Sequence, residues 1–510
     1  MSNLDSCLLG NGQSVEWSMV PLFSLPEFRD RVVRHVAQGG TLTALFAISE
    51  VQPASRNRLV AVLGMPRGTQ AEVLTAEVGD RYPSLTPYCA SAHWFEREIA
   101  EQWGIVPEGH PWLKPIRFHH SRNPERDAWQ RPRGKEIVPG VTDFYRVEGG
   151  EAHEVAVGPV HAGVIEPGHF RFQCHGEQVF HLEISLGYQH RGIERALIGG
   201  PTPGTIRLME ALAGDTSIGH TLAYVQILEG FSGARVSGRA IALRGIALEL
   251  ERLANHVGDL GALANDVGFL PTASYCGRLR GDFLNLTALL CGNRFGRSLI
   301  VPGGVRFDLD SERKKTLLER LDSVSRDVKI AVNLLWQSSS VMARFENVGV
   351  VSRETAIQLG LVGPAARASG VERDVRQDYP QGIYRFFQIP PAVWTSGDVF
   401  ARAYVRWLEI QRSELFIKDV ARGLPAGSIL EPSVETLPPN QLIVSFVEGW
   451  RGKICHVAQT DTQGKFLWYK VVDPSFHNWM GLAMALRGQQ ISDFPLCNKS
   501  FNLSYCGHDL

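Results

Sequence analysis

The sequence predicts an α+β protein with two folded parts: a small N-terminal α+β domain and a larger, mainly helical domain with β-strands near both of its ends. Between residues 20 and 118, apolar runs with strand-like patterning lie between amphipathic helical runs. Beyond residue 205, long stretches show helical periodicity instead. A polar, charged stretch separates the two regions, so we place the small domain at 1–118, a linker at 119–150 and the large domain at 151–510.

The small domain is expected to contain two helices and three strands. The first helix covers residues 26–38, because Pro26 suits a helix start and the apolar residues that follow share one face. The second covers 93–104 and ends at Gly104. The strands are expected at 41–49, 57–64 and 71–78.

The large domain is expected to open with a β-hairpin around His175–Glu177, because HFRFQC and QVFHLEISL alternate on either side of that turn. Helical periodicity then dominates the chain. The expected helices are 217–230, 237–264, 276–292, 311–343 and 397–420, and a meander of strands follows at 441–448, 453–460 and 465–472. We interpret the sequence DPSFHN after this meander as a turn that leads into a final helix.

Composition and motifs exclude several functions. The net charge is −1, so neither nucleic acid nor an anionic membrane surface is an expected partner. The 8 cysteines form no C-x-x-C pair, which argues for free thiols in a reducing compartment and against an iron–sulfur cluster held by this chain. No apolar run approaches the roughly 20 residues that cross a bilayer, so we expect membrane association only through partner proteins. The sequence also lacks G-x-G-x-x-G and Walker A nucleotide motifs.

Histidines are the main candidates for chemistry. We interpret His169, His175 and His181, which flank the hairpin, as packed side chains rather than metal ligands. His190 stands where a strand gives way to a helix. Its imidazole could deliver protons if a carboxylate such as Asp266 fixed its tautomer. The alternative is that His190 only caps the strand end and that Asp266 pairs with Arg191 or a helix terminus.

Several motifs carry a family resemblance. They are HRGIE at 190–194, the E-x-x-x-G-x-x-S-x-x-H run from Glu210 to His220, NHVGDLGALANDVGFL at 255–270, PGG at 302–304, EGWRG at 448–452 and DPSF at 473–476. In this order they resemble the large subunit of group 4 [NiFe]-hydrogenases and the D-type subunit of respiratory complex I. PSLTPYCASAHWFEREIAEQWGI, in the small domain, is similar to the C-type subunit of complex I. The fusion of both parts resembles the large subunits of formate hydrogenlyase and hydrogenase-4, and of energy-converting hydrogenase-related complexes.

The chain departs from the hydrogenases at the metal ligands. There, two C-x-x-C pairs hold nickel and iron. The resemblance places the first pair at Ala213 and Thr216 and the second at Ser475 and Asn478. Alanine supplies no ligand, and hydroxyl and amide groups are hard donors that do not suit a nickel–thiolate centre. We therefore expect vestigial ligand positions and no nickel chemistry.

The comparison with complex I implies a quinone pocket. There a histidine and a tyrosine bind the quinone headgroup, and an aspartate supports the histidine. The resemblance assigns the histidine to His190 and the aspartate to Asp266, while the tyrosine position falls at or next to Gly214. Arg191 and His220 are expected to line the same pocket.

The resemblance also implies the setting of the protein. We expect a peripheral redox subunit on the cytoplasmic face of the inner membrane, with no cofactor of its own and a quinone as a possible acceptor. A [4Fe–4S] cluster would lie in a small partner similar to the B-type subunit of complex I, accompanied by a ferredoxin-like subunit and ion-translocating membrane subunits. The alternative is a non-catalytic scaffold that transmits conformational change. Arg367, Arg373, Asp374 and Arg376 could face a cluster-bearing partner or form a solvated loop.

Overall fold

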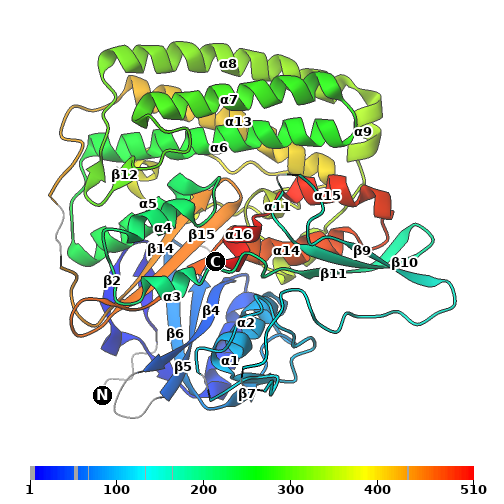
Figure 1. Cartoon of the computed structure of the whole chain (residues 1–510). Coiled ribbons are helices and arrows are strands. Elements are labelled where there is room, and N and C mark those ends of the chain that lie inside the picture. The colour runs from blue at the N-terminus through cyan, green and yellow to red at the C-terminus, as the bar shows by residue number, and fades with distance from the viewer. Residues whose placement is uncertain are drawn as a thin grey trace.

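The computed structural model of the protein describes residues 6–50, 56–66, 68–123, 125–132, 134–163, 165–432 and 436–510. Figure 1 shows the N-terminal part at one end, a set of long helices at the other, and strands and short helices between them. No helix among these described residues is long and apolar enough to cross a membrane.

The N-terminal part is a sheet with two helices packed against it. Its strands are in the order β1(Leu8–Gly10), β6(Gln70–Val78), β5(Arg56–Gly64) and β4(Thr41–Glu50), with β3(Leu22–Phe23) paired parallel to β6. The helices are α1(Leu25–Ala37) and α2(His93–Trp103). Helix α1 begins with a capping box between Ser24 and Glu27, and α2 ends at Gly104 in the left-handed conformation.

Two further sheets lie in the second part. The hairpin β10(His169–His175) and β11(Gln178–Ser185) is joined by β9(Ala152–Val157). The meander β14(Gln441–Gly449), β15(Gly452–Thr460) and β16(Phe466–Val472) takes β2(Ser14–Glu16) onto its free edge, so the N-terminal segment contributes a strand to the large domain.

Long helices cover the meander on the side away from the N-terminal sheet (Figure 1). They are α5(Ser217–Ser232), α6(Gly238–Asp266), α7(Leu270–Cys291), α8(Ser311–Gln337) and α13(Val399–Arg422). The shorter helices and strands are α3(Ile193–Leu197), α4(Thr205–Ala211), α9(Ser339–Phe345), α10(Arg353–Gln358), α11(Gly363–Arg367), α12(Val375–Asp378), α14(Pro474–Ala485), α15(Phe494–Phe501), α16(Tyr505–Asp509), β7(Arg81–Pro83), β8(Val106–Glu108), β12(Ile300–Val301) and β13(Gly304–Val305).

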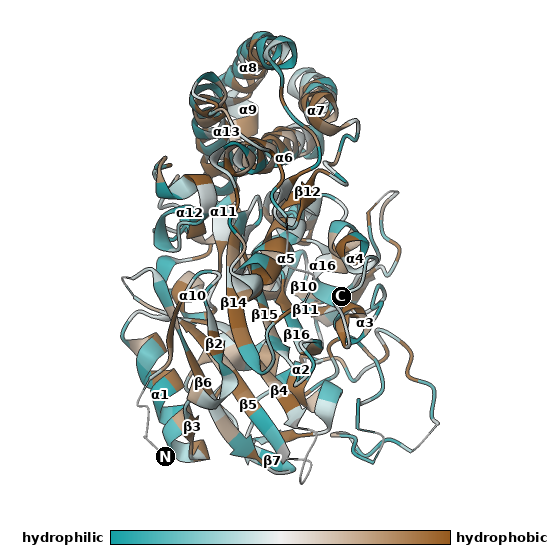
Figure 2. Cartoon of the chain, turned by 90° about the vertical axis from the view of Figure 1, so that its left-hand side faces the viewer, coloured by the Kyte–Doolittle hydropathy of each residue, from teal (hydrophilic) through white to brown (hydrophobic). Residues whose placement is uncertain are grey.

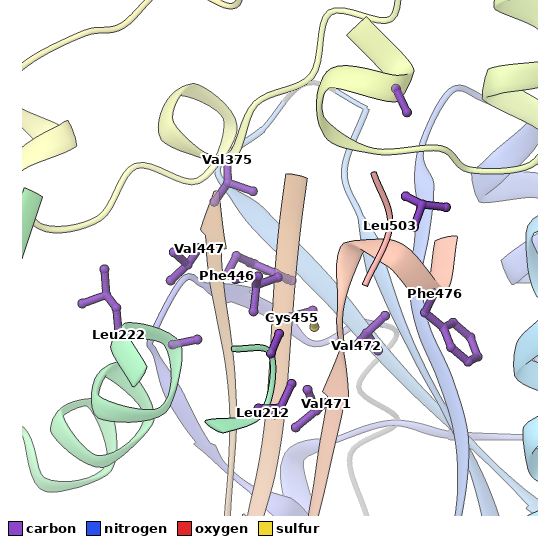
Figure 3. Packing of buried hydrophobic residues seen from close by; sticks show 14 of the residues in the cluster. Leu212, Leu222, Val375, Phe446, Val447, Cys455, Val471, Val472, Phe476 and Leu503 are labelled. Atoms are coloured by element: carbon purple, nitrogen blue, oxygen red, sulfur yellow. The ribbon is translucent and has the colours of Figure 1, made fainter. Parts of the chain in front are cut away.

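One apolar core runs through both parts of the chain. Figure 2 shows apolar residues concentrated on the inner strands and on the inward faces of the helices. Figure 3 shows Phe446 and Val447 of β14 and Val471 and Val472 of β16 in this core, together with Leu212 from the segment before α5. The α4–α5 connection is therefore anchored on the meander.

The predicted fold class is confirmed: an N-terminal α+β region precedes a mainly helical region with peripheral strands. Two details differ from the expected elements. The helix expected at 311–343 is broken at Ser338, whose extended backbone separates α8 from α9. DPSF is not a turn, because Asp473 caps α14 by accepting a hydrogen bond from the Ser475 N–H, 2.8 Å away, and the helix begins at Pro474.

Candidate functional site

The connection between α4 and α5 carries the first pair of vestigial ligand positions. Ala213 and Thr216 are buried, whereas Gly214 is exposed and Asp215 is half-buried. The β14–β15 hairpin holds this connection, since Arg451 forms a bidentate ion pair with Asp215 at 2.6 and 2.7 Å. Trp450 Nε1 donates to Thr216 Oγ1 and to the Asp215 carbonyl, each at 3.1 Å. Residues 213–216, called the 213–216 loop below, are thus fixed on one side and exposed at Gly214.

The C-terminal segment 503–510 lies against the same loop. Arg191 Nη2 donates to the carbonyls of Leu212, at 2.7 Å, and Cys506, at 3.1 Å, so one guanidinium joins the two segments. Burial, followed by the charge of Glu166, raises the pKa of the Cys506 thiol to about 12. This thiol is therefore protonated at neutral pH.

The second pair of vestigial positions lies in the first turn of α14. Ser475 Oγ accepts the Ser504 N–H at 2.9 Å, and the Asn478 side-chain amide exchanges two hydrogen bonds with the Val362 backbone. Both side chains are satisfied within the protein, as Thr216 is. A nickel–thiolate centre does not fit this donor set. Among the described residues, no group of three or more His, Cys, Asp and Glu side chains could hold a metal ion.

A buried chain of hydrogen bonds begins at His220, in the first turn of α5. His220 Nε2 lies 3.0 Å from Asp473 Oδ2, and His220 Nδ1 lies 3.1 Å from His456 Nε2. The other nitrogen of His456 lies 2.8 Å from the Tyr469 hydroxyl. One set of tautomers satisfies all three links: Tyr469 donates to His456, His456 to His220, and His220 to Asp473. We call these four residues the histidine relay.

The electrostatics of the relay favour an ionised carboxylate at one end. Burial opposes ionisation of Asp473, but the hydrogen bond and charge of His220 and the charge of Arg451 outweigh it and lower its pKa. Burial, followed by the charge of His220, lowers the pKa of His456 well below its usual value. An additional proton is therefore disfavoured on His456.

The structure does not bring His190 and Asp266 together. His190 Nδ1 donates to the Asp509 carbonyl at 2.8 Å, and the ring stacks on His119 with centroids 4.5 Å apart. Burial, followed by the charge of His119, lowers the pKa of His190 to about 4. Asp266 is exposed at the far end of α6, where Lys499 is the charge that acts on it. No hydrogen bond or ion pair between them occurs in the described part of the chain.

The other residues expected in the pocket are placed around the 213–216 loop. Arg191 and His220 both contact it, since the His220 N–H donates to the Thr216 carbonyl at 3.2 Å. At Gly214 no atom lies within 4 Å of the point that a Cβ would occupy. The position that holds a tyrosine in complex I therefore borders open space here.

The charged residues around 367–376 are not a partner-facing or solvated loop. Arg367, Asp374 and Arg376 are buried in ion pairs within the chain. Arg373 donates to the Met65 carbonyl at 3.3 Å and so reaches the N-terminal part.

Sequence reasoning misses three of the four relay residues. Asp473 reads only as a breaker between strand and helix, although aspartate before proline is also a common helix N-cap. His456 and Tyr469 lie on adjacent strands of the expected meander, so alternate positions facing one side were a usable signal. Asp266 was expected beside His190, whereas the carboxylate that contacts a histidine of the relay is Asp473, beside His220.

Comparisons with known proteins identify the family to which both parts of the chain are similar. The family model for the 30 Kd subunit of respiratory-chain NADH dehydrogenase matches residues 26–133, and that for the 49 Kd subunit matches residues 266–444. Formate hydrogenlyase subunit 5 of Escherichia coli is 28% identical over 483 residues, covering 92% of this chain and 84% of the relative. The carbon monoxide-induced hydrogenase of Rhodospirillum rubrum is 31% identical, covering 69% and 97%.

Two further proteins are similar to this chain. The D-type subunit of NADH-quinone oxidoreductase from Dehalococcoides mccartyi is 30% identical, covering 66% of this chain and 92% of the relative. A chain of the membrane-bound sulfane sulfur reductase, an archaeal respiratory membrane complex, has the same fold with a TM-score of 0.66 at 24% identity, covering 71% of this chain and 99% of that one. The chain belongs to the family in which 30 kDa-type and 49 kDa-type subunits of complex I are fused, which includes the large subunits of related hydrogenases.

Proposed function

We propose that this chain is the redox subunit of a membrane-associated, complex I-like oxidoreductase. Electrons pass from an iron–sulfur cluster in a small partner subunit to a quinone or another carrier at the 213–216 loop. The transfer is coupled to ion translocation by integral membrane subunits, and a ferredoxin-like subunit supplies the electrons. The chain acts peripherally on the cytoplasmic face of the inner membrane, and nickel takes no part.

The histidine relay is the observation that carries this proposal. A quinone that takes up two electrons also takes up two protons. His220 is poised for proton delivery because it sits one turn after the loop with a carboxylate on one nitrogen and a second imidazole on the other. The relay residues are buried, so a proton passes along hydrogen bonds rather than through bulk water.

The exposed face of the loop is the site we assign to the carrier. Gly214 and Asp215 reach the surface, and the space beside Gly214 is open. Arg191 and His220 border the loop, so a carrier bound there meets a guanidinium and lies near the relay. His190 is neutral at physiological pH and bonds to the backbone of the C-terminal segment. We therefore assign proton delivery to His220 and Asp473, and the positioning of that segment to His190.

One observation favours the alternative of a non-catalytic scaffold. Residues 503–510 pack against the loop and occupy the side on which Ser475 lies. If this segment leaves no room for a carrier in the assembled complex, the loop only transmits conformational change between partners.

Metal analysis of the purified, intact complex tests the absence of nickel chemistry. We expect iron in the amount that the partner clusters require and nickel far below one atom per chain. One nickel per chain would contradict the proposal, because none of the four ligand positions carries a thiolate.

A further inference from the structure

A second buried polar centre lies away from the 213–216 loop and has no part in the function proposed above. Three arginines and four carboxylates meet where α6, α11, α12 and α13 pack on the end of β14. They are Arg252, Arg367, Arg376, Glu249, Asp374, Glu409 and Glu448, which we call the ion cluster. All of their side chains are essentially buried.

Counted alone, the seven residues of the ion cluster have one positive charge fewer than negative charges; half-buried Arg412, which donates to the Pro390 carbonyl, acts on Glu409 and Asp374 from outside the cluster. The arginines carry three charges and the carboxylates, if ionised, carry four. His256, which lies 2.7 Å from Glu409, could supply the missing charge as an imidazolium. However, His256 Nδ1 is buried without a hydrogen-bond partner, so an N–H there would be left unsatisfied. His256 is therefore better neutral, and the cluster needs a proton on one carboxylate.

Glu448 is the carboxylate best suited to hold that proton. Glu249 accepts hydrogen bonds from arginines, Tyr384 and Ser413, whereas Glu448 accepts only one from Arg367, at 2.8 Å, and one from the Val375 N–H, at 3.0 Å. Burial, followed by the charge of Asp374, raises the pKa of Glu448 to about 7. The arginines lower the pKa of Glu249, against its burial, to about 2.

A further charged neighbour of Glu448 is Lys453, opposite it in the β14–β15 ladder, and the charges of Arg373 and Asp378 act in turn on Lys453. The Lys453 ammonium turns away to donate to Thr43 Oγ1 at 2.7 Å, and burial lowers its pKa to about 8. Lys453 therefore does not replace the missing charge by direct contact.

Water can reach Glu448. A cavity of about 850 Å³ lies between the Gly10–Ser14 turn, α5, the start of α6 and the segment around Tyr384, and Glu448 is part of its wall. The lining also includes Phe386, which is 77% exposed, so the cavity extends to the molecular surface. A volume of this size holds many water molecules.

The β14–β15 hairpin connects Glu448 to the proposed redox site. Trp450 and Arg451 follow Glu448 closely in this hairpin and hold the 213–216 loop through Asp215 and Thr216. His256, which lies 2.7 Å from Glu409 of the ion cluster, also packs edge-on against Trp450, with ring centroids 6.1 Å apart. A change in the hydrogen bonds of Glu448 is thus transmitted through a few residues to the loop.

We propose that Glu448 is a proton-binding site that exchanges with water in the cavity and is coupled to the 213–216 loop through the β14–β15 hairpin; the coupling rests on the proposed redox function. Protonation transfers one proton from water in the cavity to the carboxylate and makes the ion cluster neutral. Loss of that proton restores the excess negative charge beneath the hairpin.

Infrared spectroscopy of the purified complex, titrated from about pH 5 to pH 9, tests the proton site without any electron acceptor. Glu251 is a second buried carboxyl, whose pKa burial raises to about 8. Among the protonated carboxyl bands of the wild type, we expect one that titrates near pH 7 and one that titrates near pH 8. Glu448→Gln removes the band with the midpoint near 7, and the matched control Glu251→Gln removes only the other.

The possible outcomes test the proton site separately from its coupling to the 213–216 loop. If Glu448→Gln fails to assemble, Glu251→Gln alone must leave one carboxyl band that titrates near pH 7. Retention of that band in Glu448→Gln, or its absence from Glu251→Gln, overturns the proton site. The pH profile of turnover then tests the coupling. It should lose its step near pH 7 in Glu448→Gln, and an unchanged step would overturn the coupling. An inactive wild-type complex that still shows the band would contradict the redox function and leave the proton site standing.

Discussion

His220 is held by neighbours from two different strands, so the fold fixes both of its nitrogens. Asp473 follows β16 and His456 lies on β15, and each of them contacts one of the two imidazole nitrogens. A histidine arranged in this way changes its protonation state only together with its neighbours. This coupling distinguishes His220 from His190, whose bonds are to a backbone carbonyl and a stacked ring.

The first prediction concerns the histidine relay. His220→Ala should lower turnover of the complex by about 10²–10⁴, the range for a positioned acid–base group. Asp473→Asn should lower turnover as well, and the double variant should be little worse than His220→Ala, because the pair acts as a unit. His190→Ala is the comparator, and recovery of the assembled complex serves as the folding check. A large loss in His190→Ala together with normal turnover in His220→Ala would return proton delivery to His190.

At the scale of single residues, the sequence motifs indicated candidate positions along the chain, but they did not indicate which side chains contact each other. In the motif from Glu210 to His220, AGDT was expected to interrupt two helical runs, and it forms the connection between α4 and α5; the burial of His220 was not indicated by the sequence. The carboxylate could not be chosen from spacing, because Asp473 lies 253 residues from His220 and only the packing of α5 on the meander brings them together. Asp266 lies within the motif at 255–270 that carries the family resemblance, but it stands at the exposed end of α6.

At the scale of elements, the site depends on how the C-terminal segment docks. Arg191 joins three carbonyls, those of Ala211, Leu212 and Cys506, so it holds the segment against the loop. The long helices and the meander were predictable because their periodicity extends over many residues. Helices α15 and α16 were not, since they have only 8 and 5 residues and depend on tertiary contacts.

The second prediction concerns this docking. Arg191→Lys keeps the charge but loses the planar fork that reaches the three carbonyls. Hydrogen exchange should become faster in residues 503–510 and 211–216 and stay unchanged elsewhere. Arg195→Lys, an exposed arginine on the neighbouring helix, is the matched control. Equal protection of both segments in the two variants would show that Arg191 does not hold them together.

The third prediction concerns restored ligands. Replacing Ala213, Thr216, Ser475 and Asn478 by cysteine should not produce hydrogen evolution. In the present fold Asn478 hydrogen-bonds the Val362 backbone rather than a group of the loop, and a first ligand shell without supporting contacts leaves a loose site. Hydrogen evolution by the fourfold variant in a nickel-replete host would refute this expectation.

At the scale of the whole molecule, buried charges join the N-terminal part to the large domain. Lys470 of β16 forms ion pairs with Glu98 of α2 at 2.6 Å and with Glu194 of α3 at 2.9 Å. Gln102 of α2 also donates to Glu194 at 3.2 Å. The order of an N-terminal α+β region and a mainly helical region was predictable from the apolar patterning, but these contacts, between residues more than 90 positions apart in the sequence, were not.

The fourth prediction tests this junction. Lys470→Ala removes the cation that two buried carboxylates share, while Glu98 keeps Arg117 and Glu194 keeps Arg122, so it should lower the free energy of unfolding by about 1–3 kcal/mol. Lys465→Ala removes an exposed lysine just before the same strand and should change stability by no more than about 0.5 kcal/mol. Thermal unfolding of the purified protein or complex measures both. Equal stability of the two variants would mean that the junction contributes little.

Reoxidation of the partner clusters tests the central claim most directly. The intact complex is reduced in the absence of oxygen, quinone analogues are added, and the cluster signal is followed by electron paramagnetic resonance. We predict that at least one analogue reoxidises the clusters in the wild type, and that His220→Ala slows this reaction by about 10²–10⁴. Clusters that stay reduced with every quinone, in a complex that is fully assembled, would contradict quinone as the acceptor and favour the scaffold.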